Sequence, residues 1–181
     1  MIIYITGEPG SGKTFLLNSL PIAGYDLDDI YNEQWKYHRK WEIVQKGALK
    51  KINALIEKHK DIAFVGFINK KNLVFSPDYT FILFRDDYEL YYRQKLIRDL
   101  EYLCKDKDEW IKTFKKDPVE DFKRMDPFNE ILNFKTLEEF IENNKVRIRK
   151  LQEDFPEAKI MKAKDINTFV KKHKDETIHH V

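Results

Sequence analysis

The sequence has little cysteine, little glycine and no long apolar run. Cys104 is the only cysteine among 181 residues, so no internal disulfide can form, and we expect a reducing, cytoplasmic location. No apolar stretch approaches the roughly 18 residues that a membrane-spanning helix requires, and the first residues, MIIYIT, do not follow a signal-peptide pattern. The net charge of +2 is too small to indicate a partner by itself. We therefore expect a protein without a membrane partner.

The composition is that of a folded domain with a well-solvated surface. Hydrophobic residues make up 42% of the chain and charged residues 35%, which disfavours intrinsic disorder. No repeat, low-complexity tract or linker interrupts the sequence, and its length suits one hydrophobic core. We predict a single domain over 1–181, and the composition leaves the oligomeric state open.

Short apolar runs alternate with helical patterns along the chain. The strand-like runs cover 1–6, 62–68, 79–84 and 158–163, with a weaker one at 22–27. Helical patterns cover 13–20, 33–59, 87–104, 108–125, 137–153 and 165–173. Near-continuous apolar strands are typical of a parallel sheet covered on both faces, so the predicted class is α/β. The connection 69–78 is too short for a helical crossover and is expected to be an irregular loop.

Half of the few glycines lie in one motif, GEPGSGKT at 7–14, directly after the first apolar run. The motif fits G-x-x-x-x-G-K-[ST], in which glycines let backbone N–H groups wrap around phosphate oxygens. In this pattern Lys13 reaches the β and γ phosphates, and the Thr14 hydroxyl holds Mg²⁺. A plain strand-to-helix turn would need neither side chain. The candidate nucleotide-binding residues are Gly7, Pro9, Gly10, Ser11, Gly12, Lys13, Thr14 and Phe15.

With this motif complete, the sequence resembles the P-loop NTPases of the Walker A superfamily. The apolar run 62–68 ends in Gly66, Phe67 and Ile68 without a carboxylate, which favours small phosphotransferases over motor ATPases. The resemblance implies a three-layer α/β/α fold whose five-stranded parallel sheet has the order 2-3-1-4-5. It also implies ATP and Mg²⁺ as cofactors, and a backbone contact of Ala163 and Lys164 with the adenine.

An acidic turn, YDLDDIY at 25–31, follows the expected second strand. It resembles the D-x-D of shikimate and gluconate kinases and the paired aspartates of polynucleotide 5′-hydroxyl kinases. The resemblance implies that Asp28 accepts or orients the proton of the acceptor hydroxyl, with Asp29 beside it, and that Asp26 assists Mg²⁺ through water. The alternative is that Asp28 or Asp29 caps a helix that begins near Ile30.

The segment 30–60 is basic, with aromatic residues near its beginning. Rings combined with cations suit an acceptor that carries a base and a phosphate, such as a nucleoside monophosphate or a nucleic-acid end. The alternative is a solvated helix surface. The acceptor-binding candidates in this segment are Trp35, Lys36, Arg39 and Lys40.

The family resemblance also implies a lid, expected at about 93–135, whose arginines close over the transferring phosphoryl group. The candidates are Arg93, Arg98 and Arg124, and each has an alternative as a surface arginine paired with a nearby acid. His173 and the histidines after it lack acidic or cysteine partners at ligand spacing, so we expect a frayed tail there.

These features together predict an ATP-dependent kinase that transfers a γ-phosphoryl group to a small, anionic acceptor. The alternatives are a polynucleotide 5′-hydroxyl kinase that uses the basic segment as a strand track, and an ATP-binding switch that hydrolyses slowly or not at all.

Overall fold

The computed structural model describes residues 1–95 and 136–178, which fall into two compact units. The first, called the sheet unit below, comprises Met1–Arg85 with Val146–Val181, and the second comprises Asp86–Lys145. The sheet unit contains the phosphate-loop motif and the acidic turn. The expectation of one domain over 1–181 stays a prediction.

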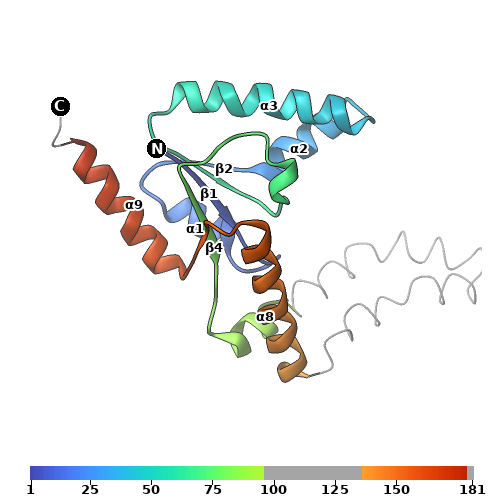
Figure 1. Ribbon diagram of the computed structural model, residues 1–181, viewed down its shortest axis with the longest axis vertical. Helices are drawn as coiled ribbons and strands as arrows, with labels where there is room; N and C mark the ends of the chain where they lie inside the picture. Colours follow the sequence, from blue (N-terminus) through green and yellow to red (C-terminus); the bar gives the residue numbers. More distant parts are fainter. Residues whose placement is uncertain (96–135, 179–181) are drawn as a thin grey trace, which may run out of the picture. The chain divides into compact units, whose positions relative to one another are not determined.

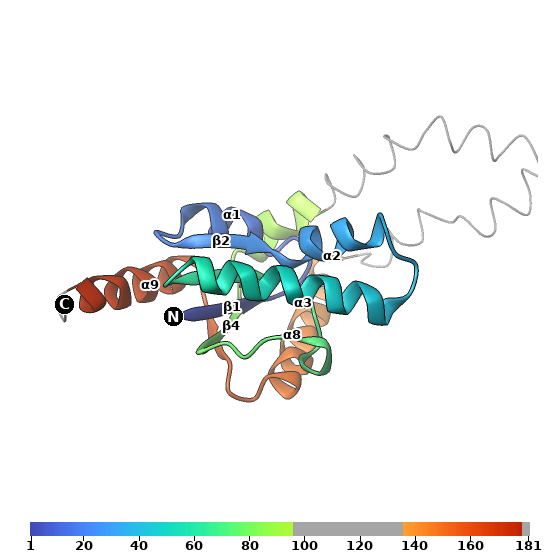
Figure 2. The same cartoon turned by 90° about the horizontal axis from the view of Figure 1, so that it is seen from above.

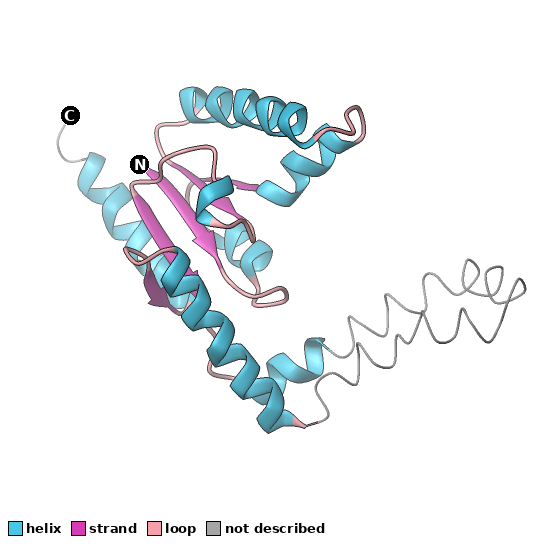
Figure 3. Cartoon of the chain, turned by 45° about the vertical axis from the view of Figure 1, so that its right-hand side comes forward, coloured by secondary structure: helices cyan, strands magenta, loops and turns pink. Residues whose placement is uncertain are grey.

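A parallel sheet of five strands lies at the centre of the sheet unit (Figure 1; strands in magenta in Figure 3). The strands are β1 (Ile2–Thr6), β2 (Ala23–Asp26), β3 (Ile62–Val65), β4 (Tyr79–Leu83) and β5 (Lys159–Met161). Their spatial order is β2-β3-β1-β4-β5, which confirms the predicted class and strand order. Because all strands run parallel, the segments that follow them emerge at one edge of the sheet. Ligands bind at this edge in open α/β sheets.

Helices cover both faces of the sheet, as the continuous burial of β1 and β3 requires. The helices are α1 (Lys13–Ser19), α2 (Leu27–Trp35), α3 (Trp41–Lys58), α8 (Leu137–Asp154) and α9 (Ala163–Ile178). On one face, α1 and α9 bury a core of residues such as Ile3, Ile5, Leu16, Ile166 and Val170. On the other, α2, α3 and the end of α8 bury a core of residues such as Tyr4, Leu27, Ile52, Phe64 and Leu151. Among the described residues, none of the helices is long and apolar enough to cross a membrane.

The helix predicted at 33–59 is wrong as a single element, because the chain breaks after Trp35 and restarts at Trp41. The carbonyl of Gln34 accepts hydrogen bonds from the N–H groups of Tyr37 and His38, both at 3.1 Å, and these contacts end α2. Lys40 then has extended backbone angles, so that α3 turns back alongside α2 (Figure 2).

Most other predicted boundaries agree within a few residues. The run at 62–68 is a strand only to Val65, and the connection 69–78 is irregular apart from the 3₁₀ helix η1 (Lys70–Asn72). The chain is helical at 88–95, within the helix predicted at 87–104. The helix predicted at 108–125 lies outside the described residues.

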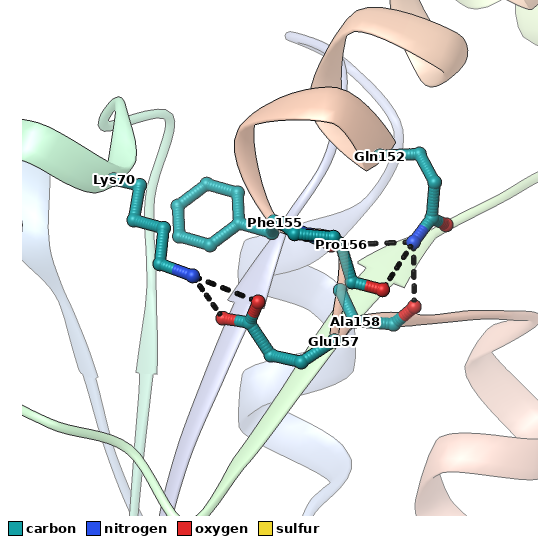
Figure 4. Close-up of polar contacts among 6 residues, drawn as sticks. All are labelled: Lys70, Gln152, Phe155, Pro156, Glu157 and Ala158. Carbon is teal, nitrogen blue, oxygen red and sulfur yellow. Dashed lines mark hydrogen bonds and ion pairs between the residues drawn. The ribbon is translucent and has the colours of Figure 1, made fainter.

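The end of α8 is tied to β5 by a cluster of polar contacts (Figure 4). The Gln152 side-chain amide donates to the carbonyls of Phe155, Pro156 and Ala158 at 3.2, 3.2 and 3.0 Å. Lys70 of η1 forms an ion pair with Glu157 at 2.8 Å. These contacts fix the turn that leads into β5 and hence the start of α9.

Candidate functional site

The GEPGSGKT motif forms the turn between β1 and α1, at the sheet edge where ligands bind. Gly10 and Gly12 have φ angles of 84° and 94°, a left-handed conformation that glycine adopts without steric cost. Gly12 is the N-cap of α1, and no side chain caps this helix. The N–H groups of the first helical turn have no intrahelical acceptor, so they are available to an anion.

The Lys13 side chain folds back over the turn. Its ammonium group donates to the carbonyls of Gly7 and Glu8, at 2.7 and 3.0 Å. Two side-chain atoms of the turn, Glu8 Oε1 and Ser11 Oγ, are buried and have no hydrogen-bond partner among the described residues. Because buried polar atoms are normally paired, the turn has the chemistry of a site that takes up a polar ligand.

The two predicted Mg²⁺ ligands lie in contact. Thr14 Oγ1, in the first turn of α1, donates to Asp26 Oδ2 at the end of β2, at 3.1 Å. A hydroxyl and a carboxylate are hard oxygen donors of the kind that Mg²⁺ prefers. Among the described residues, no group of three or more His, Cys, Asp or Glu could hold a metal by itself. The pair therefore fits an ion that takes most of its ligands from phosphate oxygens and water.

The acidic turn begins α2, and Asp26 rather than Asp28 or Asp29 is the helix cap. Asp26 Oδ1 accepts the backbone N–H of Asp28 at 3.0 Å. The alternative in which Asp28 or Asp29 caps the helix is therefore wrong, and α2 begins at Leu27, not near Ile30. Partial burial, followed by repulsion from Asp26, raises the pKa of Asp28 above its usual value, while the charge of Lys13 lowers it. Asp28 thus has a raised proton affinity and lies within electrostatic reach of the phosphate-loop lysine.

The predicted acceptor-binding residues lie at the end of α2 and in the turn that follows it. Trp35 ends the helix and stacks on Trp41, with ring centroids 6.0 Å apart. The side chains of Lys36, Arg39 and Lys40 are exposed in the 36–40 connection. The structure therefore brings the predicted rings and cations together.

The remaining predicted site residues lie in different parts of the structure. Ala163 and Lys164 begin α9 at the same sheet edge as the phosphate loop, and both are exposed. Phe15, in the first turn of α1, is 81% exposed. Arg93 lies in the second unit, where it forms an ion pair with Glu89 at 2.8 Å. Their assignments stay predictions.

Several sequence candidates lie outside the described residues: Arg98, Arg124, His179 and His180. Of the C-terminal histidines, His173 lies in α9, where its ring contacts the carbonyl of Phe169 at 2.9 Å.

One arginine at the phosphate loop was missed by the sequence reasoning. Arg147 of α8 reaches the buried carboxylate of Glu8, with Nη1 2.7 Å from Oε2. Asn144 and Leu151, three residues before and four residues after it, are both buried. Two features of the sequence could have indicated this pair. Arg147 lies at helical spacing between buried positions, and Glu8 is an acid inside the glycine-rich motif.

The comparisons with known proteins bear on the fold. No protein-family model and no curated protein sequence matches the chain. Among solved structures, the chain is similar to shikimate kinase from Bacteroides thetaiotaomicron, with 15% sequence identity, a TM-score of 0.50 and 98% of each chain covered. At this identity the likeness shows the fold alone, a five-stranded parallel sheet with helices on both faces.

Proposed function

We propose that the protein is an ATP-dependent phosphotransferase that uses Mg²⁺ and transfers the γ-phosphoryl group to the hydroxyl of a small acceptor. The phosphate loop 7–14 would bind the ATP phosphates, and Thr14 with Asp26 would hold Mg²⁺. Asp28 would bind the acceptor. The likeness to a shikimate kinase structure supports the kinase fold, and the choice of acceptor is a separate inference.

The observation that carries this proposal is the hydrogen bond between Thr14 Oγ1 and Asp26 Oδ2. It connects the phosphate loop after β1 with the acidic turn after β2, although β3 separates these strands in the sheet. A glycine-rich turn that served only to join a strand to a helix would not need this contact. Phosphoryl transfer requires donor and acceptor to be held in line, and this contact holds the two turns together.

The chemistry follows from the charges at this junction. Lys13 neutralises charge on the β and γ phosphates, and the backbone N–H groups of the loop orient them. Mg²⁺, when bound, neutralises the phosphate oxygens further. The acceptor oxygen forms a bond to the γ phosphorus, the bond from that phosphorus to the bridging oxygen breaks, and ADP leaves. The hydroxyl proton passes to Asp28, whose raised pKa makes it a stronger base than an ordinary aspartate.

An acceptor screen tests the proposal. The protein is incubated with γ-labelled ATP and pools of nucleosides, nucleotides, sugars and 5′-hydroxyl oligonucleotides, and labelled products are separated. We expect transfer to one pool, none with Lys13→Ala, and none with Asp28→Asn although ATP still binds. Glu33→Gln is the matched control, because Glu33 is an exposed acid of the same helix and forms its ion pair with Lys51 of α3.

Two outcomes would contradict the proposal. Full transfer by Asp28→Asn would remove Asp28 from the role of base. Tight ATP binding without transfer to any pool would favour the alternative of an ATP-binding switch, which the missing carboxylate after β3 allows.

A further inference from the structure

We propose that the acceptor is a nucleotide, whose base stacks on an aromatic platform formed by Trp35 and Trp41 and whose phosphate is bound by Lys36, Arg39 and Lys40. This inference rests on the proposed function, because it names the acceptor of the same site. The observations that carry it are a ring stack, an unpaired hydroxyl, a helix face and a group of cations.

The ring stack joins α2 to the start of α3. The ring centroids of Trp41 and Tyr31 lie 5.6 Å apart, with 16° between the ring planes. Those of Trp41 and Trp35 lie 6.0 Å apart, with 25° between the planes. Trp35 and Trp41 remain 42% and 38% exposed, whereas Tyr31 is 6% exposed. Tyr31 therefore anchors the stack in the core, while both indoles leave part of their apolar surface open to solvent. A nucleobase is the ligand that such a surface suits best, because every base has a π face.

The hydroxyl of Tyr31 is an independent sign of a missing partner. It is buried and forms no hydrogen bond with any described residue. Buried tyrosine hydroxyls normally have a hydrogen-bond partner. The Tyr31 hydroxyl is therefore suited to bind a polar atom at the edge of a ligand that enters the ring cluster. A purely structural ring cluster gives no reason for leaving it unpaired.

The platform lies on the same face of α2 as the proposed base. Asp28, Tyr31 and Trp35 are spaced by three and four residues, the spacing that places side chains on one side of a helix. From Asp28 to Trp35 the helix rises about 10 Å, or two turns. An acceptor hydroxyl at Asp28 and a base at the tryptophans would therefore belong to one elongated molecule that lies along α2.

The cations complete the recognition of a nucleotide. Lys36, Arg39 and Lys40 occupy the short connection between the two tryptophans, and all three are exposed. Within the described part of the chain, none of them forms an ion pair. Phosphate is the anion that accompanies a base in biological ligands, and arginine with lysine is its usual partner set. The source of the nucleotide can be a free mononucleotide or the 5′ end of a strand.

Direct binding tests the inference without requiring catalysis. Calorimetric titrations compare adenosine 5′-monophosphate with ribose 5-phosphate, which carries the phosphate but lacks the base. Both are titrated with and without a non-hydrolysable ATP analogue that occupies the phosphate loop. We expect the nucleotide to bind more tightly than ribose 5-phosphate, and Trp35→Ala to weaken its binding roughly fivefold to a hundredfold. Trp35→Phe keeps a ring and should retain most of the affinity.

Matched variants separate the platform from its surroundings. Tyr37→Ala removes an aromatic residue that is 76% exposed, lies two positions after Trp35 and stacks on no ring in the described part of the chain, so nucleotide affinity should not change. Arg39→Gln should weaken nucleotide and ribose 5-phosphate equally, whereas Lys50→Gln, on the exposed side of α3, should affect neither. Thermal unfolding of each variant shows that the fold is intact.

A 5′-hydroxyl tetranucleotide identifies the source. Affinity that falls more steeply with salt for the tetranucleotide than for the mononucleotide indicates that the cations track a strand, and equal slopes indicate a free nucleotide. Equal affinity for the nucleotide and ribose 5-phosphate, or an unchanged affinity in Trp35→Ala, would overturn the inference. If the platform binds nucleotides but the acceptor screen shows no transfer, the proposed function fails while the binding site stands.

Discussion

The ion pair between Glu8 and Arg147 should be worth more to stability than its half-exposed arginine suggests. The Glu8 side chain is only 6% exposed, Arg147 is 50% exposed, and the two are 2.7 Å apart. The other carboxylate oxygen of Glu8 is buried, and no residue that the structure describes forms a hydrogen bond with it. Arg147→Met keeps the aliphatic stem but leaves a buried carboxylate with no cation.

The expected loss in the free energy of unfolding lies between two known cases. Exposed ion pairs contribute about 0.2–1 kcal/mol, and breaking a fully buried pair from one side costs about 3–5 kcal/mol. Because water reaches half of the arginine but little of the carboxylate, we expect Arg147→Met to cost about 2 kcal/mol. In a protein of this size, that loss lowers the melting temperature by about 4–8 °C.

The reverse change should be milder. Glu8→Gln removes the buried charge and leaves Arg147 free to turn into solvent, so we expect a loss of about 0.5–1 kcal/mol. With Gln at position 8, adding Arg147→Met should cost little more, because the charge that needed compensation is gone.

Urea unfolding of the single variants, the double variant and Arg149→Met measures these differences. Arg149 lies on the exposed side of the same helix and forms no ion pair with a described residue, so it controls for the loss of a cation from α8. A loss for Arg147→Met no larger than that for Arg149→Met would refute the reasoning. So would a larger loss for Glu8→Gln than for Arg147→Met, since the buried carboxylate would then not be the group that needs a partner.

Two further predictions concern the acidic turn and the end of α8. The raised pKa of Asp28 means that ionisation destabilises the fold as pH rises from its unfolded value of 3.8 through the folded pKa, so Asp28→Asn should raise the melting temperature at pH 8. This gain should shrink as pH falls toward 3.8, and a less stable Asn variant at pH 8 would contradict the raised pKa. Gln152→Met keeps the side-chain length but removes three hydrogen bonds to carbonyls, which should cost about 1–2 kcal/mol in urea unfolding. A loss equal to that of the exposed control Glu153→Gln would show that these bonds contribute nothing.

The glycine-rich turn at 7–14 and the sheet could be predicted from sequence because their signals are local. The loop requires glycine where φ is positive and a lysine and a threonine at fixed positions after it, all within eight residues. The strands are short apolar runs buried on both faces, and such runs remain visible without knowledge of the partners. The order of the strands came from resemblance, and the pairing of β1 with both β3 and β4 agrees with it.

The break between α2 and α3 could not be predicted in the same way. The residues 34–41 contain no glycine or proline, and their spacing continues the helical pattern. The break depends on the stacking of Trp41 on Tyr31 and Trp35, a contact that forms only when the chain turns back. Arg147 was missed for a related reason, because its partner Glu8 lies 139 positions away in the sequence.

Asp26 is the residue through which the two halves of the proposed site meet. Its Oδ1 caps α2 through the N–H of Asp28, and its Oδ2 accepts the hydroxyl of Thr14. Because the two oxygens have separate partners, a ligand that binds beside Thr14 need not break the hydrogen bond that caps α2. Asp28 and the aromatic residues of α2 would then stay in place. The acceptor segment can therefore differ in its rings and cations while the donor loop stays unchanged. Under the proposed function, the motif at 7–14 binds the phosphate donor, whereas α2 and the turn after it select the acceptor.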